Sequence, residues 1–226
     1  MLQNSEVSGL QMLHVSKSAV DGSDLSGSPA YQAAMRLGRG ERPAPASPAG
    51  AFLAARTRYL AGDRIDMRGL ATELGVSRPT LYRWTGPREQ LIADVLFALS
   101  DRVFERAKHE TAHLVGTERL LAVFRRHVEA IADSRALQAF RRQEPQAALR
   151  ILTARNGLIN PRTVRQVADF YREEQAAGQF DPPADVDTLA FAVVCLAEGF
   201  IYNDLGAAVE PEVDRAAAVV ALLLGA

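Results

Sequence analysis

The chain has 226 residues, a formal net charge of −1 and a single cysteine, Cys195. It is long enough to bury a sizeable core, the lone cysteine excludes an intrachain disulfide, and the charge balance argues against a protein that coats DNA generically. No apolar run approaches the ~20 residues of a membrane helix and no secretory signal is evident, so we predict a cytoplasmic protein with no membrane partner.

Residues 1–47 are rich in Ser, Gly and Pro and contain few aromatic side chains. The run RPAPASP at residues 42–48 cannot form regular helix or a central strand, because proline lacks the backbone donor. We therefore predict a mostly disordered N-terminal extension. The alternative is a basic arm, since Arg36, Arg39 and Arg42 recur at every third position.

Three short helices are predicted next, and the second and third fit a helix-turn-helix pattern. Residues 48–61 form the first helix and residues 67–74 the second. Gly75 ends the second helix, because glycine accepts the left-handed conformation at least cost. Ser77 is the predicted N-cap of the third helix, and Pro79 suits its first turn, where a missing N–H costs nothing.

The third helix has a composition that suits a DNA groove. Leu81 is expected to face the second helix, while cations, a hydroxyl and an aromatic ring lie on the exposed side. Three arginines and no acidic residue lie between Ser77 and Arg88, a bias that favours phosphate contact. Arg78 and Arg83 are the predicted guanine contacts.

The run LGVSRPTLYRWTGPREQL at residues 74–91 resembles the DNA-binding unit of TetR-family transcriptional regulators. Thr85 stands where that family usually has an aromatic residue, and Pro87 where it often has a capping Ser or Asn, so the start of the next helix is expected to differ. Trp84 either supplies the displaced aromatic packing or faces the phosphates, and its large apolar area favours packing. By position, the resemblance implies DNA contact by Arg68, Arg78, Pro79, Thr80, Tyr82, Arg83 and Arg88.

A long helix is predicted over residues 87–115, and by the resemblance it connects the DNA-binding unit to a sensor. It contains His109-Glu110-Thr111-Ala112-His113, which matches the HExxH pattern of zinc peptidases. That pattern, when extended, needs a third histidine where this chain has Arg119, and no strand is evident to hold a peptide. We therefore predict no metal site, no cofactor and no enzyme, with a zinc peptidase as the remote alternative.

The rest of the chain is predicted to be helical, over residues 118–132, 133–143, 145–156, 160–177, 186–205 and 210–224. Residues 186–205 are apolar almost all round, so this helix must be covered on every side. The last helix also carries more apolar side chains than a monomer should expose. The economical solution is a homodimer through the last two helices, which the resemblance also implies.

The resemblance further implies that a small molecule binds within the C-terminal helices and shifts the connecting helix. For the apolar candidates core packing is the alternative, and for Glu198 the alternative is an interface contact. The opening of the ordered chain is most similar to a subgroup related to a regulator of quorum-sensing-signal degradation, and a lactone-type ligand is only an implication of that likeness. The candidate ligand-binding residues are Phe124, His127, Phe140, Phe170, Tyr171, Phe191, Cys195, Glu198 and Tyr202.

Together these features predict an all-α protein with three segments: an extension (1–47), a helix-turn-helix domain (48–92) and a regulatory and dimerisation domain (93–226). The predicted function is a ligand-released repressor that binds an inverted-repeat operator as a homodimer. Only on the alternative interpretation of residues 1–47, as a basic arm, would this segment also reach the minor groove. A ligand-independent regulator or an activator is the alternative. The sequence does not name the effector or the operator.

Overall fold

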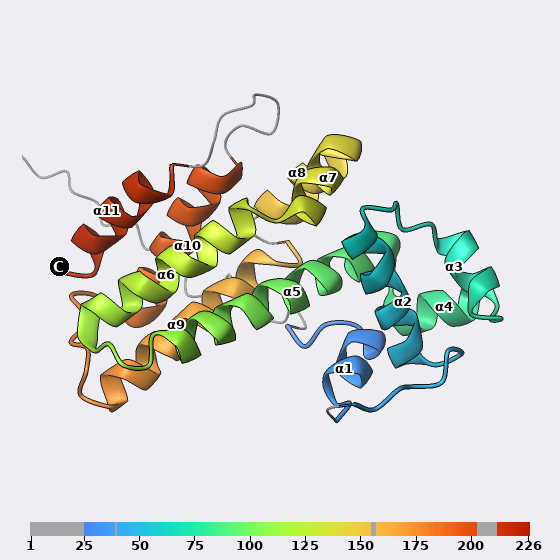
Figure 1. The fold of residues 1–226 in the computed structure, drawn as a ribbon, viewed down its shortest axis with the longest axis horizontal. Helices are drawn as coiled ribbons and strands as arrows, with labels where there is room; N and C mark the ends of the chain where they lie inside the picture. The colour runs from blue at the N-terminus through green and yellow to red at the C-terminus, as the bar shows by residue number, and fades with distance from the viewer. Residues whose placement is uncertain (1–24, 39, 155–156, 203–211) are drawn as a thin grey trace, which may run out of the picture.

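The structure is a computed structural model that describes residues 25–38, 40–154, 157–202 and 212–226, and within these ranges it contains eleven helices and no strand (Figure 1). The helices are α1 Pro29–Met35, α2 Pro48–Ala61, α3 Met67–Glu73, α4 Arg78–Thr85, α5 Arg88–Glu110, α6 Gly116–Ala132, α7 Arg135–Gln143, α8 Pro145–Thr153, α9 Asn160–Ala176, α10 Val186–Tyr202 and α11 Val213–Leu223. The all-α prediction is confirmed.

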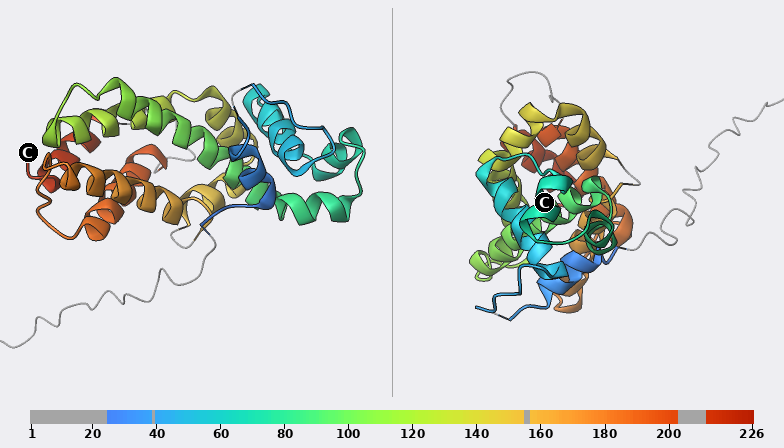
Figure 2. Two further views of the ribbon diagram at one scale, coloured as in Figure 1. Left: turned by 90° about the horizontal axis from the view of Figure 1, so that it is seen from below. Right: turned by 90° about the vertical axis from the view of Figure 1, so that its right-hand side faces the viewer.

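The molecule is elongated, and α5 runs along it from one end toward the other (Figures 1 and 2). Helices α2, α3 and α4, here called the helix-turn-helix unit, lie at one end. Helices α6, α9, α10 and α11, here called the C-terminal bundle, lie at the other end and pack on one another. A movement of α5 would therefore change its packing against both the helix-turn-helix unit and the C-terminal bundle.

The local signals in the sequence explain the helix-turn-helix unit. Asp66 caps α3 by accepting from the backbone N–H groups of Arg68 (3.1 Å) and Gly69 (2.8 Å). Gly75 follows α3 with φ of +66°, the left-handed conformation that was expected of it. Ser77 caps α4 through the Thr80 N–H at 3.3 Å. A tight turn thus fixes the angle between α3 and α4.

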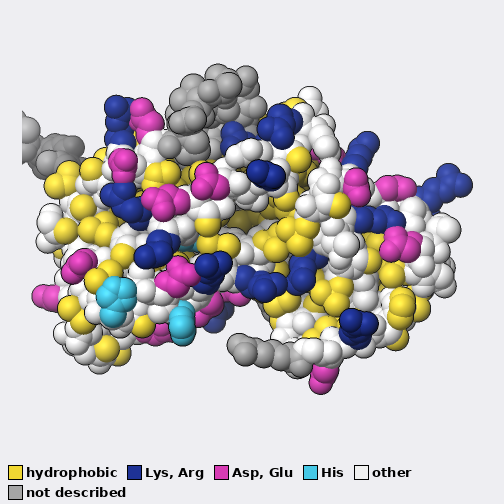
Figure 3. Space-filling model, in the orientation of Figure 1, with side chains coloured by type: hydrophobic (Ala, Val, Ile, Leu, Met, Phe, Trp, Pro, Cys, Tyr) yellow, Lys and Arg dark blue, Asp and Glu magenta, His cyan; other side chains and the backbone are white. Residues whose placement is uncertain are grey.

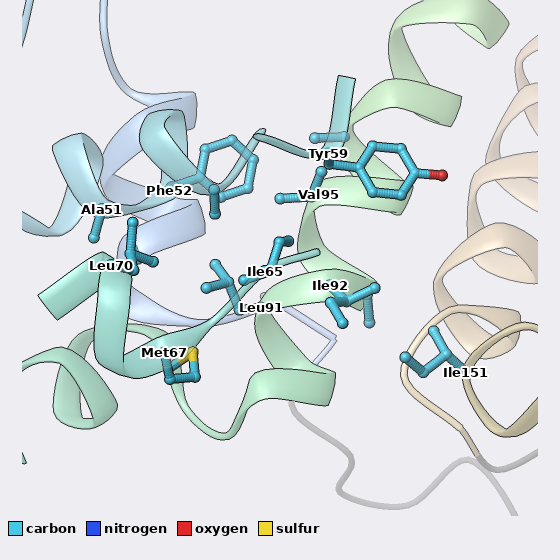
Figure 4. Close-up of a cluster of buried hydrophobic side chains, with 14 of the residues drawn as sticks. Ala51, Phe52, Tyr59, Ile65, Met67, Leu70, Leu91, Ile92, Val95 and Ile151 are labelled. Carbon is cyan, nitrogen blue, oxygen red and sulfur yellow. The ribbon is translucent and has the colours of Figure 1, made fainter. Parts of the chain in front are cut away.

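The hydrophobic core of this unit extends beyond residue 92, where the sequence placed the domain boundary. Phe52, Leu70 and Leu91 are fully buried in it (Figure 4), and side chains of α7 and α8, including Leu137 and Ile151, belong to the same cluster. The helix-turn-helix unit therefore shares a core with the first half of α5 and with the α7–α8 pair. The boundary at residue 92 stays a prediction.

The prediction of disorder for residues 1–47 is wrong for α1, while residues 1–24 lie outside the described part. Ser28 caps α1, Ala30 is completely buried, and the Tyr31 ring meets the Phe52 ring edge-on at 5.8 Å. Composition misled because only a few apolar side chains of this segment are needed to anchor a seven-residue helix on α2 and α5. Arg36 and Arg42 are exposed, whereas Arg39 lies outside the described residues.

Candidate DNA-binding surface and effector cavity

One surface at the end of the molecule is formed by the exposed sides of α3 and α4. Arg78, Tyr82 and Arg83 are exposed on α4, and Arg68 is exposed on α3. Leu81, on the opposite side of α4, is fully buried against the core. Figure 3 shows Lys and Arg side chains at this end of the molecule, with some acidic ones among them. The surface therefore presents three guanidinium groups and a phenol to the outside.

The two remaining α4 candidates lie at the start of the helix. Pro79 is exposed, and Thr80 is half-buried with its hydroxyl 2.9 Å from that of Ser77. Both lie in the first turn of α4, whose positive dipole end attracts phosphate oxygens. The structure thus brings six of the seven predicted DNA-contacting residues to one surface.

Arg88, the seventh candidate, is directed into the protein. Its Nε donates to the Ile65 carbonyl at 2.6 Å, and its Nη2 donates to Glu144 Oε1, also at 2.6 Å. Arg64 lies 3.5 Å from the other Glu144 oxygen. In this conformation Arg88 ties the start of α5 to the α7–α8 corner instead of offering its charge to DNA. The sequence could not reveal this, because Glu144 is 56 residues away.

The two departures from the TetR pattern lie at the end of α4 and the start of α5. Thr85, where an aromatic residue was expected, is completely buried and donates its hydroxyl to the Leu81 carbonyl at 3.0 Å. Trp84 is half-buried and packs against the core of the helix-turn-helix unit, in line with the packing hypothesis. Pro87 occupies the N-cap position of α5 without a side-chain cap.

A cavity of about 150 Å³ lies between α5, α6, α9 and α10. Its wall is mostly apolar, and several ring side chains from different helices contribute to it. Six of the nine predicted ligand-binding residues line it, namely Phe124, His127, Phe170, Tyr171, Glu198 and Tyr202.

Phe140, Phe191 and Cys195 do not line the cavity, so these three predictions are wrong for the cavity described. Phe140 packs edge-on against Tyr59 at 6.1 Å, in the core of the helix-turn-helix unit. Phe191 is 41% exposed and Cys195 is half-buried on α10, and neither residue lines the cavity. Helical phase decides this: Val194 and Glu198, one turn apart, face the cavity instead.

Two hydrogen-bonded pairs supply polar groups to the cavity wall. Ser100 Oγ and His127 Nε2 lie 2.9 Å apart, and the Phe104 ring meets the imidazole edge-on at 5.2 Å. Asn160 Nδ2 donates to both carboxylate oxygens of Glu198, at 2.9 and 3.0 Å. An apolar cavity with few polar groups is typical of a small-molecule site.

Comparison with known proteins gives the family. Residues 115–225 match the family described as tetracyclin repressor-like, C-terminal domain. The solved structure of the R. erythropolis transcriptional repressor QsdR, from the TetR family, is similar over 78% of this chain and 93% of that chain, with 30% sequence identity and a TM-score of 0.72. The chain belongs to the TetR family. No curated protein matches it.

This TetR-family chain is therefore a DNA-binding transcriptional regulator, and the resemblance to the QsdR subgroup is confirmed. The region that matches the family covers the C-terminal bundle and the cavity wall that α6, α9 and α10 form. No helix in the described ranges has the length and apolar character needed to cross a membrane.

The zinc-peptidase alternative loses its geometric basis in this TetR-family fold. Helix α5 ends at Glu110, so His109 and His113 do not stand on successive turns of one helix. The Glu110 carboxylate accepts from Arg106 at 2.7 Å and from Arg126 at 3.1 Å. In the part of the chain that the structure describes, no group of three or more His, Cys, Asp or Glu side chains is placed to hold a metal ion.

Replacing Glu144 with glutamine should lower the free energy of unfolding by about 1–2 kcal/mol, because the neutral amide weakens a partly buried charge-assisted hydrogen bond to Arg88. Urea denaturation with linear extrapolation measures this. The matched control is Glu89→Gln, whose pair with Arg150 is about half exposed and should contribute less than about 0.5 kcal/mol. Equal effects of the two variants would contradict the role given to Arg88.

His127 should make stability depend on pH. Burial lowers the pKa of His127 from 6.5 to about 4, and only the Ser100 hydrogen bond opposes this shift. Between these two pH values the unfolded chain binds a proton that the folded protein does not. The free energy of unfolding is therefore highest above pH 6.5 and decreases as the pH falls toward 4. Relative to the His127→Leu variant, the free energy of unfolding of the wild type should fall by about 3 kcal/mol over that range. Urea denaturation at each pH measures the difference. A constant difference would mean that the imidazole protonates freely in the folded state.

Proposed function

We propose that this regulator binds an inverted-repeat operator as a homodimer and is a repressor that a small molecule releases. The observation that carries the DNA-binding part is the exposed surface of α3 and α4, with its three arginines. Arg78 and Arg83 contact guanines, Thr80 and Tyr82 contact phosphates or thymine methyl groups, and Arg68 contacts a flanking phosphate.

Exposed apolar residues on α10 and α11 support the dimer. Phe191 is 41% exposed on α10, and Leu222 is 77% exposed on α11, the least covered of the large apolar side chains in the described ranges. Half-buried Cys195 and exposed Gly199 continue the α10 stripe at helical spacing. Two copies of these faces would form a four-helix interface that removes the apolar surface from water.

The cavity favours a ligand-controlled regulator over a ligand-independent one. Helix α5 contributes to the cavity wall and also to the core of the helix-turn-helix unit. Suppose that the ligand binds more tightly when α5 takes a position unsuited to DNA. The ligand then reduces the affinity for the operator, and the operator reduces the affinity for the ligand by the same factor. The sign of regulation rests on the description of QsdR as a repressor.

Selection of bound duplexes from a random pool tests the proposal. The expected product is a palindrome whose half-sites are about one helical turn, or 34–36 Å, apart. Light scattering of the free protein should give twice the chain mass of 24.5 kDa. A monomer that selects no sequence at moderate ionic strength would refute the proposed function.

A further inference from the structure

Tyr59 is a residue of the helix-turn-helix unit that reaches the cavity of the C-terminal part. It lies on α2, is only 5% exposed, and lines the cavity together with side chains of α5, α6, α9 and α10. Figure 4 shows its hydroxyl pointing away from the labelled core residues of the unit. Tyr59 is not among the ligand-binding residues predicted from the sequence.

The Tyr59 hydroxyl is buried and has no hydrogen-bond partner among the described residues. A buried hydroxyl without a partner is unfavourable, because it has lost its water and gained nothing in return. The Ser77–Thr80 pair at the start of α4 and the Ser100–His127 pair in the cavity wall show that other hydroxyls of this chain find partners. The unpaired donor is therefore an unusual feature in the cavity wall.

The surroundings of Tyr59 indicate the chemistry of the missing partner. Burial and the neighbouring Tyr202 raise the pKa of Tyr59, so the phenol keeps its proton and remains a donor. His127 is neutral at pH 7, because burial lowers its pKa to about 4, and no Lys or Arg side chain lines the cavity. An anionic ligand would find no countercharge there. The carboxylate in the wall, Glu198, already accepts from Asn160 Nδ2 with both oxygens, so the cavity suits an uncharged ligand.

We propose that Tyr59 donates a hydrogen bond to a carbonyl-type oxygen of an uncharged, mostly apolar ligand, and that this bond links the ligand directly to the helix-turn-helix unit. The inference rests on the proposed function, in that the cavity is the effector site. Its volume of about 150 Å³ equals that of an engineered apolar cavity known to take benzene, so a single small ring or a short chain fits.

The position of Tyr59 explains how such a contact would affect DNA binding. Helix α2 packs against α4, and Arg58, the residue before Tyr59, pairs with Glu73 on α3. A ligand that holds the phenol against the cavity therefore holds α2, and with it α3 and α4, in one orientation relative to α5. The ligand and the operator then favour different orientations of the helix-turn-helix unit. This coupling does not require side chains of α6 or α9 to move.

Two probes of seven heavy atoms test the proposal: cyclohexanone, which has the carbonyl oxygen, and methylcyclohexane, which lacks it. Titration calorimetry, or ligand-observed NMR for weak binding, measures their affinities for the full chain. Tyr59→Phe keeps the ring but removes the donor, so it should reduce cyclohexanone affinity about 5- to 10-fold and leave methylcyclohexane affinity unchanged. Tyr31→Phe is the matched control: Tyr31 packs on Phe52 outside the cavity, and its loss should not change the preference between probes.

A second measurement does not depend on the probes. Since the hydroxyl has no partner in the free protein, Tyr59→Phe should have a melting temperature equal to or higher than that of the wild type. A decrease of several degrees would mean that the hydroxyl is already satisfied, and would overturn the inference.

The outcomes separate this inference from the proposed function. If wild type and Tyr59→Phe bind both probes equally, the cavity is a ligand site but Tyr59 is not the donor. If the wild type binds neither probe, both the effector site and the inference fail. If Tyr59→Phe loses cyclohexanone affinity while cyclohexanone still releases the wild type from its selected duplex, both stand.

Discussion

Replacing Asp94 with asparagine should lower the free energy of unfolding by about 3–5 kcal/mol, because it leaves a buried arginine without a countercharge. Asp94 on α5 is fully buried and receives three hydrogen bonds, from the Ser28 backbone N–H (3.0 Å), Gln90 Nε2 (3.0 Å) and Arg162 Nη1 (2.8 Å). This one carboxylate therefore joins the N-terminus of α1, the connecting helix and α9.

Arg162 cannot easily move to water when its partner is removed. It is 5% exposed and lies between the rings of Tyr31 and Phe97, 4.5 and 3.9 Å from their centroids. Cation–π contacts of this kind stabilise the guanidinium but do not replace a carboxylate. Releasing Arg162 would also release α1, because Tyr31 belongs to that helix.

Urea denaturation of Asp94→Asn measures the effect, and Asp169→Asn is the control. Asp169 is also paired with arginines, on α9, but its side chain is 55% exposed, so its loss should change stability by less than about 0.5 kcal/mol. The double variant Asp94→Asn with Arg162→Met should be more stable than Asp94→Asn alone, since it removes the uncompensated charge. If Asp94→Asn behaved like the control, the three-way contact would not be a structural anchor.

Arg78→Ala should weaken binding to the selected operator by roughly 2–6 kcal/mol per dimer. A bidentate contact to one guanine contributes about 1–3 kcal/mol of discrimination, and a homodimer on an inverted repeat loses two such contacts. Arg78 is the N-terminal residue of α4 and is exposed, so its removal should not disturb the core. Fluorescence anisotropy at fixed salt, on the operator and on an unrelated duplex, measures the change.

The two duplexes decide the role of Arg78. A base contact predicts a large loss on the operator and a small one on the unrelated duplex, whereas a phosphate contact predicts equal losses and a smaller salt dependence. Arg165→Ala is the control, because Arg165 is an exposed arginine on α9, in the C-terminal bundle. A similar loss for that variant would indicate only the effect of net charge.

The cavity shows why the sequence could name only part of the candidate site. The pattern of apolar residues on α10 was visible, but whether Glu198 or Cys195 faces inward depends on how α10 is rotated against α9. The sequence therefore selected the right helix and, for Phe191 and Cys195, the wrong side of it. Tyr59 was missed for a similar reason, since a contact between α2 and the C-terminal cavity arises from packing over a long sequence distance.

The sequence by itself determined the helix-turn-helix unit, because each of its decisive features acts within a few residues: the Asp66 cap, the turn at Gly75, the Ser77 cap and the buried Leu81. It also determined the all-helical class and the family. The tertiary structure alone decided that α1 is folded, that Arg88 is directed into the protein, and that Asp94 and Tyr59 join the two ends of the molecule. Those features depend on side chains from distant helices, so the contacts form and contribute to stability only once the helices have packed.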